Sequence, residues 1–401
     1  MLSLIEILIA ALSVAALLMS CVLAVEIAAA MPFGAVRPDR AAPRRASTVA
    51  VLVPAHDEAQ GIAATLASIR QQMQEGDRLL VVADNCSDAT ADVARAQGAD
   101  VAERNDPEVR GKGHALYFGI ERLSLHAPDV VIVLDADCIL GPGALDLLAA
   151  EAAATGRPVQ ALYLMRAARD APLQQKVSAF AFRVKNHVRY LGLKRLALPC
   201  PLAGTGMAFP WPIIRDAPLA TGNIVEDMKL GIDLAVAGHP AVFEPRADVT
   251  SRFPSTEHGQ VTQRRRWEHG HLATILAEAP RLVGEAFRQR RAGLFGMALD
   301  LMIPPLSFLI LALASLVILA AALQVWGGEG IALALSASAA VLAGLGLLAA
   351  WFVFGRDLLS VADLIAIPCY VARKIPLYAR AFYARERQWV RSTRRNEDGR
   401  C

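Results

Sequence analysis

Three uncharged apolar segments limit what this chain can fold into more strongly than any other feature of its sequence. They run from Ile7 to Val25, from Leu301 to Trp326 and from Ile331 to Gly355. Each is close to the roughly 20 residues that a helix needs to cross the hydrocarbon core of a bilayer. The sequence therefore predicts three transmembrane helices. Neither the second nor the third segment contains an ionisable residue, which disfavours a transporter.

The first segment has a second interpretation, because small residues at 28–30 follow it as they would at a signal-peptide cleavage site. A signal peptide, however, carries basic residues before its apolar stretch. Here Glu6 precedes the segment, and four arginines follow it: Arg37, Arg40, Arg44 and Arg45. These flanks favour a retained membrane anchor.

Basic residues also predict the orientation, since Lys and Arg accumulate on the cytoplasmic side of a span. The connection at 327–330 has none, whereas residues 373–395 hold eight. We therefore expect a multi-pass protein of the inner, cytoplasmic membrane, with the N-terminus outside and the long stretch after the first span in the cytoplasm. Leu358–Ala372 is apolar but short and contains Asp363, which predicts an interfacial helix rather than a fourth span. The small net charge of +3, with basic clusters beside the spans, favours membrane lipid over nucleic acid as a partner.

Short β-branched runs alternate with helical stretches from residue 49 onward. Strands are predicted at 49–54, 78–84 and 130–137, and helices follow the first two. Apolar strands alternating with helices indicate an α/β fold with a mostly parallel sheet covered on both faces. Polar residues follow each strand, at 54–58, 84–85 and 135–137. Because ligands bind at the carboxyl ends of such strands, we expect one crevice to collect all three sets.

Two of these carboxylates, Asp135 and Asp137, are one residue apart at a strand end. Oxygen ligands of this kind suit Mg²⁺ or Mn²⁺, although an aspartate in a strand-ending turn is equally ordinary. The segment 110–120, "RGKGHALYFGI", places Lys112 at a glycine-flanked helix start. It is either a phosphate-binding turn or a plain helix N-terminus, and it is not a P-loop.

Two further segments carry candidate chemistry. Glu226 and Asp227 open an amphipathic helix, where they are either dipole-favoured capping residues or, for Asp227, a general base. The segment "QRRRW" at 263–267 offers guanidinium forks for a diphosphate and a tryptophan face for a sugar. For Arg264 and Arg265, contact with lipid head groups is an equal alternative.

Taken in order, these motifs resemble those of family 2 glycosyltransferases, the inverting GT-A enzymes that include cellulose, hyaluronan, chitin and poly-N-acetylglucosamine synthases. The resemblance covers residues 48–275 and the flanking helices. It is carried by "VLVPAHDE" (51–58), "VVADNCSDAT" (81–90), "VLDADC" (133–138), "VEDMKLG" (225–231), "QRRRW" (263–267) and "GTGMAF" (204–209). It implies a Rossmann-like GT-A domain that binds a nucleotide sugar, with a divalent ion.

The resemblance also implies a role for each motif residue. Asp227 becomes the catalytic base and Asp137 the metal ligand. The nucleotide-sugar contacts are Pro54, Ala55, Glu58, Asp84, Lys112 and Asp135. The diphosphate and acceptor contacts are Gln263, Arg266, Trp267, Glu226 and Gly204. Two departures weaken the choice of nucleotide and of acceptor: Ala83 stands where many members have a second Asp, and Val225 stands where cellulose synthases have Thr.

The predicted organisation has five parts: an N-terminal transmembrane helix (1–30), a juxtamembrane linker (31–47), a cytoplasmic GT-A domain (48–285), two transmembrane helices (298–355), and an interfacial helix with a basic tail (356–401). The predicted function is transfer of a hexose or N-acetylhexosamine, expected from a UDP-sugar, to a lipid-linked or growing glycan of the cell envelope or an exopolysaccharide. A processive polysaccharide synthase is one alternative. A membrane-anchored sugar-nucleotide-binding protein without turnover is another.

Overall fold

The computed structural model describes residues 4–31, 45–168, 170–220, 225–253 and 257–372. The chain forms two compact units. The first contains the described residues of Met1–Phe33, Ala167–Leu198 and His271–Arg387, and the second those of Gly34–Arg166 and Pro199–Gly270. The domain boundaries expected from the sequence stay a prediction.

An eight-stranded sheet forms the centre of the second unit, in the order β3-β2-β1-β4-β7-β6-β8-β5. Its strands are β1 Val49–Ala55, β2 Arg78–Asp84, β3 Asp100–Arg104, β4 Val130–Val133, β5 Cys138–Leu140, β6 Val159–Arg166, β7 Met207–Pro210 and β8 Val242–Arg252. Four neighbouring pairs are parallel, β1 with β2, β1 with β4, β2 with β3 and β6 with β8. The sheet is therefore mostly parallel, as predicted.

The antiparallel pairs are the part of the sheet that the sequence did not predict. β7 runs antiparallel to both β4 and β6, and β5 runs antiparallel to β8. The predicted strand at 130–137 is also shorter, since β4 ends at Val133. Beyond it the chain turns, with the Cys138 N–H donating to the Asp135 carbonyl, and β5 begins at Cys138. This turn places Asp135 and Asp137 at the sheet edge instead of inside a strand.

Helices cover the sheet and bury its alternating side chains. They are α2 Ile62–Arg70, α3 Thr90–Ala96, α4 Lys112–Leu123, the 3-10 turn η1 Ser124–His126, α5 Ala144–Thr155, α8 Trp211–Arg215 and α9 Glu226–Val236. One core cluster joins alternate residues of β1, β2, β4 and β7 to α4, α8 and α9. Because successive strand residues point to opposite faces, Val51 and Ile132 are buried on the other side. The helix α10 Glu257–Gln289 follows β8 along the chain.

Arg45 is buried in the second unit, where it forms ion pairs. The sequence had placed it among the basic residues that flank the first predicted span. Its Nε donates to Asp146 at 2.6 Å, and its Nη1 donates to Asp77 at 2.7 Å and to the Ser47 carbonyl at 3.0 Å. The Arg45 side chain is 1% exposed. It therefore fixes the start of the unit to the loop before β2 and to α5, and it does not meet lipid.

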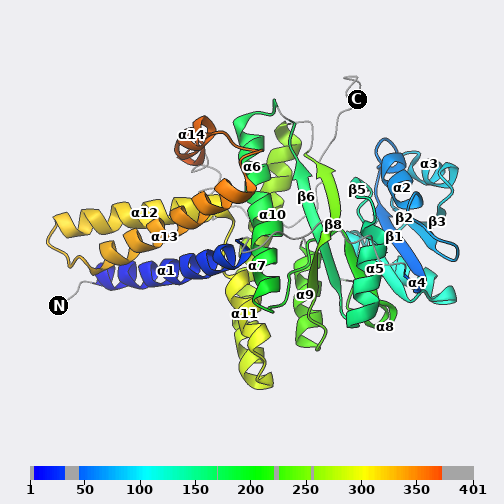
Figure 1. The fold of residues 1–401 in the computed structure, drawn as a ribbon, viewed down its shortest axis with the longest axis horizontal. Coiled ribbons are helices and arrows are strands. Elements are labelled where there is room, and N and C mark those ends of the chain that lie inside the picture. Colours follow the sequence, from blue (N-terminus) through cyan, green and yellow to red (C-terminus); the bar gives the residue numbers. More distant parts are fainter. Residues whose placement is uncertain (1–3, 32–44, 169, 221–224, 254–256, 373–401) are drawn as a thin grey trace. The chain divides into compact units, whose positions relative to one another are not determined.

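The first unit contains three helices that are long and apolar enough to cross a membrane: α1 Leu4–Ala30, α12 Leu306–Val325 and α13 Ile331–Phe354. Figure 1 shows them as long helices of one bundle. The second of these helices starts later than predicted. The helix α11 Ala292–Leu301 is separate from it, and Pro304 and Pro305 lie between the two helices. Alanines such as Ala339 and Ala343 are buried in the bundle, where small side chains allow close helix packing.

A continuous helical segment, α6 Leu173–Arg183, the π-helix η2 Val184–Arg189 and α7 Tyr190–Arg195, packs in the same unit. Arg189, which is 4% exposed, donates to Glu26 Oε2 at 2.7 Å and to Asp300 Oδ1 at 2.6 Å. A Cβ on Gly192 would lie 2.1 Å from the Glu26 carbonyl oxygen, so this glycine permits direct backbone contact. The segment is thereby fixed to α1 and α11.

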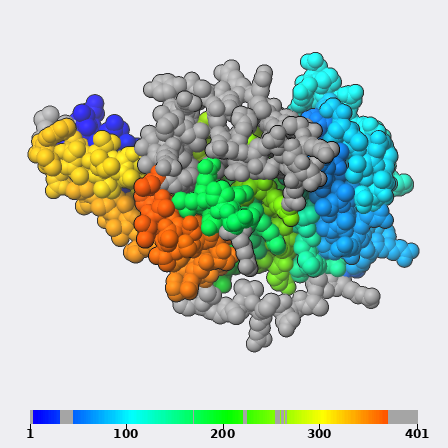
Figure 2. All heavy atoms as spheres, turned by 90° about the horizontal axis from the view of Figure 1, so that it is seen from above, coloured from blue at the N-terminus to red at the C-terminus, as the bar shows by residue number. Residues whose placement is uncertain are grey.

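The short predicted helix near the C-terminal end is present as α14 Val361–Ala372. Its start has a reciprocal cap, because the Ser360 N–H donates to Asp363 Oδ2 and the Asp363 N–H donates to Ser360 Oγ. Asp363 also lies 3.8 Å from Lys176 Nζ of α6, and Figure 2 shows the orange atoms of α14 against the green atoms of α6. Its predicted position at a membrane surface stays a prediction, and the basic tail lies outside the described residues.

Candidate functional site

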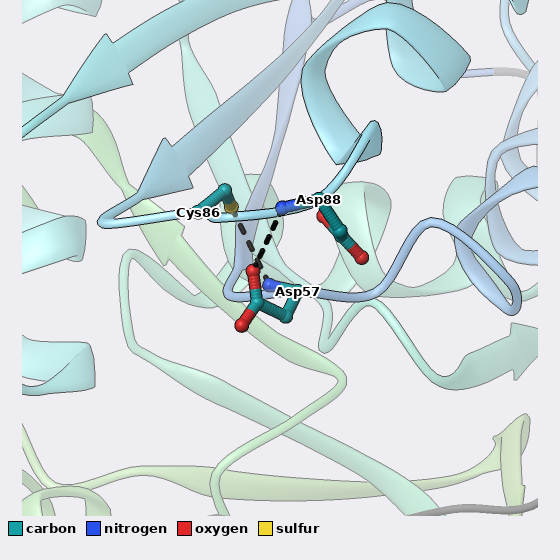
Figure 3. Close-up of side chains that lie close together, drawn as sticks. All are labelled: Asp57, Cys86 and Asp88. Atoms are coloured by element: carbon teal, nitrogen blue, oxygen red, sulfur yellow. Dashed lines mark hydrogen bonds between the residues drawn. The ribbon is translucent and has the colours of Figure 1, made fainter. Parts of the chain in front are cut away.

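The loops after β1 and β2 are bonded to each other at the carboxyl edge of the sheet (Figure 3). Asp57, which has a φ of 51°, accepts the Ser87 N–H at 2.6 Å and the Asp88 N–H at 3.2 Å. Cys86 Sγ accepts the Asp57 N–H at 3.4 Å, and burial raises the pKa of the Cys86 thiol. Asp57, Cys86 and Asp88 are close enough to hold a metal ion, but they are already engaged in the hydrogen bonds that join the two loops. We call these three residues the loop clamp.

Four of the predicted nucleotide-sugar contacts lie beside this clamp, and two of them, Glu58 and Asp84, are the predicted nucleoside contacts. Pro54 and Ala55 end β1, and the Glu58 N–H donates to Thr90 Oγ1 at 2.7 Å. Asp84 ends β2 and is 8% exposed, and its Oδ1 accepts Arg104 Nη1 at 2.6 Å. The nucleoside roles of these residues stay a prediction.

Arg104 was not among the residues singled out from the sequence. It ends β3 directly opposite Asp84 in the register of the parallel pair. It also donates to the Val109 carbonyl at 2.7 Å. The only signal in the sequence is a charged residue at the end of a short strand, and that pattern identifies nothing until the neighbouring strand is known.

Asp135 and Asp137 belong to a second group of side chains that could hold a divalent ion. Their oxygens and Cys138 Sγ all lie within 4.8 Å of one another. Cys138 is fully buried, burial raises the pKa of its thiol, and its Sγ donates to Asp137 Oδ1 at 3.4 Å. A protonated thiol is a poor ligand, so the two carboxylates would be the donor set for an ion at this site, and such oxygens fit Mg²⁺ or Mn²⁺.

Lys112 is the first residue of α4, and its ammonium contacts both Asp135 and the backbone of Gly204. Its ammonium forms an ion pair with Asp135 and donates to the Gly204 carbonyl at 2.6 Å. Burial by itself lowers the pKa of Lys112, but Asp135, Glu226 and Asp227 outweigh it and hold that pKa above its usual value. For Asp135, burial raises the carboxyl pKa and Lys112 opposes the rise. The lysine is therefore a fixed positive charge among carboxylates.

The segment 203–206, which we call the Gly204 loop, has a backbone that only glycine adopts easily at two positions. Gly204 has a φ of 86° and Gly206 a φ of 64°. A Cβ on Gly206 would also lie 2.7 Å from the Ala161 Cβ. Thr205, fully buried between the glycines, accepts the Asp135 N–H at its Oγ1 at 3.0 Å. The "GTG" sequence thus has a conformational reason in this fold.

The Gln160 side chain of β6 is hydrogen-bonded to the backbone of the Gly204 loop. Gln160 was not among the residues predicted from the sequence. Its fully buried side chain donates from Nε2 to the Thr205 carbonyl at 2.9 Å and to the Ala161 carbonyl at 3.0 Å. Its Oε1 accepts the Ala203 N–H at 2.9 Å. The available signal was a single amide residue inside an otherwise apolar strand, "VQALYLM". Buried amides of this kind are normally fully hydrogen-bonded.

Asp227 lies against the Gly204 loop. A Cβ built on Gly204 would be 3.1 Å from Asp227 Oδ2 and 3.6 Å from Lys112 Nζ. Glu226 precedes it at the start of α9, and burial, followed by the charge of Asp227, raises the pKa of Glu226 to about 7. The predicted base and the predicted phosphate-side lysine therefore approach the same point of the loop.

The "QRRRW" residues lie on α10. Gln263, Arg266 and Trp267 are half-buried, and within the described part of the chain the buried Nε of Arg266 has no hydrogen-bond partner. One turn later, a Cβ on Gly270 would lie 2.7 Å from Val225 Cγ1, so this helix packs against the residue before Glu226. The diphosphate and acceptor roles stay a prediction. The side chains of Arg264 and Arg265 lie outside the described residues.

Comparison with protein families decides the class of the chain. A model described as glycosyltransferase-like family 2 matches residues 43–270, more than half of the 401 residues. The chain belongs to this family. It is therefore a transferase enzyme by class, and the family expected from its motifs is confirmed.

Two curated relatives support this membership. The chain is 38% identical over 103 residues to an uncharacterized glycosyltransferase of Mycobacterium bovis and to one of Mycobacterium tuberculosis. Each match covers 26% of this chain and 43% of the relative, so the chain spans less than half the length of these proteins.

A solved structure resembles nearly the whole chain. It is a mannosyltransferase from Pyrobaculum calidifontis in complex with GDP-Man and Mn²⁺, with a TM-score of 0.53 and 18% sequence identity. The likeness covers 94% of this chain and 95% of that one. It shows that the GT-A fold expected from the sequence is correct.

Proposed function

We propose that the chain transfers a sugar from a nucleotide sugar, by inversion at the anomeric carbon, to a lipid-linked or growing glycan acceptor in envelope or exopolysaccharide biosynthesis. A UDP-hexose or UDP-N-acetylhexosamine is the proposed donor. The observation that carries the proposal is the convergence of Lys112, Asp135, the Gly204 loop and Asp227 in one unit. These residues come from four separate segments, and Asp135, the Gly204 loop and Asp227 belong to segments that resemble motifs of the family.

In this proposal the donor side of the site binds and orients the diphosphate. Asp135 and Asp137 would hold Mg²⁺ or Mn²⁺, and the chemistry that such an ion would supply is charge neutralisation of the departing diphosphate. The mannosyltransferase of similar fold was solved with Mn²⁺. Arg266 contributes a guanidinium whose buried Nε is available for a phosphate oxygen. The nucleoside lies toward Glu58 and Asp84.

Asp227 is the proposed base on the acceptor side. An inverting transfer needs the acceptor hydroxyl deprotonated as it attacks the anomeric carbon opposite the leaving group. In this proposal Asp135 and Asp137 are committed to the ion, whereas Asp227 faces the Gly204 loop at the start of α9. The Gly204 loop then forms one wall of the acceptor site.

The proposed location is the inner membrane, with the catalytic unit in the cytoplasm. Three helices long enough to span a bilayer and the basic residues after the last of them support this orientation. A nucleotide sugar would then be used on the side where it is made, and the acceptor would be reached at the bilayer surface.

A donor screen and one pair of variants test the proposal. The purified chain is incubated with UDP-glucose, UDP-N-acetylglucosamine and GDP-mannose, the last because the mannosyltransferase of similar fold was solved with GDP-Man. Nucleotide release and product length are then measured. Long polymer would identify a processive synthase, and single additions a lipid-linked acceptor.

Asp227→Asn keeps the shape of the side chain and removes its basicity. Transfer is expected to fall by about 10²-fold to 10⁴-fold with little change in nucleotide affinity. The matched control is Asp233→Asn on the same helix, where the native carboxylate binds Lys229 Nζ at 2.6 Å. Near-wild-type turnover of Asp227→Asn, or loss of nucleotide binding, would refute the assignment and make Glu226 the candidate base.

A further inference from the structure

Lys112 connects two parts of the site that bind different substrates in the proposed reaction. Its ammonium forms an ion pair with Asp135, on the side of the divalent ion and donor. The same Nζ donates to the carbonyl of Gly204, at 2.6 Å, on the acceptor side. One flexible side chain therefore holds both a metal-side carboxylate and the acceptor loop.

The positions of the surrounding charges explain why the lysine rests there. Asp135 is flanked by Asp137, and Glu226 and Asp227 also act on the Lys112 charge. Carboxylates gathered this closely repel one another unless a cation lies among them. In the ion-free protein, Lys112 is the cation that the described residues place on Asp135.

We propose that Lys112 is the internal counter-ion of the ion-free site, and that a divalent ion arriving at Asp135 and Asp137 displaces it from both Asp135 and the Gly204 carbonyl. Two cations a few ångströms apart repel each other, so the ion and the ammonium compete for the same carboxylate. The inference rests on the divalent ion of the proposed function, and on neither the donor sugar nor the acceptor.

A binding order follows from this competition. While Lys112 holds the Gly204 carbonyl, the Gly204 loop is tied to the donor side and lies against Asp227. Ion binding removes that tie and leaves the ammonium near the Asp227 carboxylate or near an incoming diphosphate. The ion therefore binds first, and the acceptor binds to a loop that has been released.

The first test measures Mn²⁺ binding to the full-length protein without nucleotide, from the signal of free Mn²⁺ in electron paramagnetic resonance. Lys112→Met should bind Mn²⁺ about tenfold more tightly than the wild type, because no charge-assisted hydrogen bond has to be broken. The matched control is Lys229→Met, which removes a lysine of similar exposure, 26% against 21%, that pairs with Asp233. It should change the affinity less than about twofold.

The second test follows hydrogen exchange of the Gly204 loop in the wild type, so that it does not depend on a variant that folds. Mn²⁺ should increase deuterium uptake of the loop, whereas in Lys112→Met the uptake should be high already and insensitive to Mn²⁺. Unchanged Mn²⁺ affinity in Lys112→Met, or a loop in the wild type that does not respond to Mn²⁺, overturns the inference and leaves the proposed function intact. Absence of Mn²⁺ binding in every variant would overturn both.

Discussion

The Gly204 loop depends on one buried side chain, so replacing Gln160 by Leu is the sharpest perturbation of the site. Leucine has a similar size but offers no polar atom. It would leave the Ala203 N–H and the Thr205 carbonyl without the bonds of 2.9 Å that Gln160 now makes to each. A buried backbone group left unsatisfied costs roughly 1–3 kcal/mol. For the two groups together we expect a loss of about 2–6 kcal/mol in the free energy of unfolding.

Thermal unfolding of the purified protein measures this loss. A loss of 1 kcal/mol lowers the melting temperature of a domain of this size by about 2–4 °C, so Gln160→Leu should lower it by roughly 4–24 °C. Where the protein remains folded, kcat should fall more than the KM for the donor changes, because the Gly204 loop faces Asp227, the proposed base. The control is Gln71→Leu, at an exposed position, which should stay within about 0.5 kcal/mol of the wild type.

Two results would refute this reasoning. If Gln160→Leu melts like the wild type and keeps its turnover, the Gly204 loop is not held by this side chain. If Gln71→Leu is equally destabilised, the effect comes from added apolar surface and not from the loss of the three hydrogen bonds.

Three further predictions concern the metal ion, the pair Glu226 and Asp227, and the unit that contains the three apolar helices. Excess EDTA, or Asp137→Ala, should abolish transfer, and undiminished transfer in either case would exclude the proposed ion. Burial raises the pKa of Glu226 from 4.5 to about 7, so the folded protein binds the carboxyl proton of Glu226 more tightly than the unfolded chain does. The contribution of this group to stability is therefore full below pH 4.5 and is lost as the pH rises through 7. Glu226→Gln should flatten that part of the pH dependence of the melting temperature, and an unaltered slope would contradict the assignment. Arg189→Met leaves the carboxylates of Glu26 and Asp300 buried without their cation, and it should lower the free energy of unfolding by about 3–5 kcal/mol. The control Arg195→Met, at an exposed position, should lower it by less than about 1 kcal/mol. Equal losses in the two variants would refute the role given to the buried ion pairs.

Features with a local cause could be predicted from the sequence. Apolar length predicted three helices long enough to span a membrane; α1 extends beyond the predicted segment at both ends, and α12 begins later than predicted, after Pro304 and Pro305. Alternation of strands and helices predicted the α/β fold, and the ends of the strands correctly placed Asp84 and Asp135 at one edge of a sheet. A helix start was likewise readable at Lys112. Each of these depends on neighbours within a few residues, whose periodicity or backbone preference is written in the local sequence.

Partners distant in the sequence were decided only by the tertiary structure. Gln160 meets Thr205 45 residues away, Lys112 meets Gly204 92 residues away, and Arg189 meets Glu26 163 residues away. No local sequence pattern predicts such a partner. A buried polar side chain forms hydrogen bonds with the groups that the packed sheet and helices bring within about 3 Å, and its neighbours in the sequence do not determine which groups these are. Arg45 shows the same point: its sequence neighbours predicted a charge flanking the membrane, and the packing of two distant carboxylates made it a buried ion-pair residue.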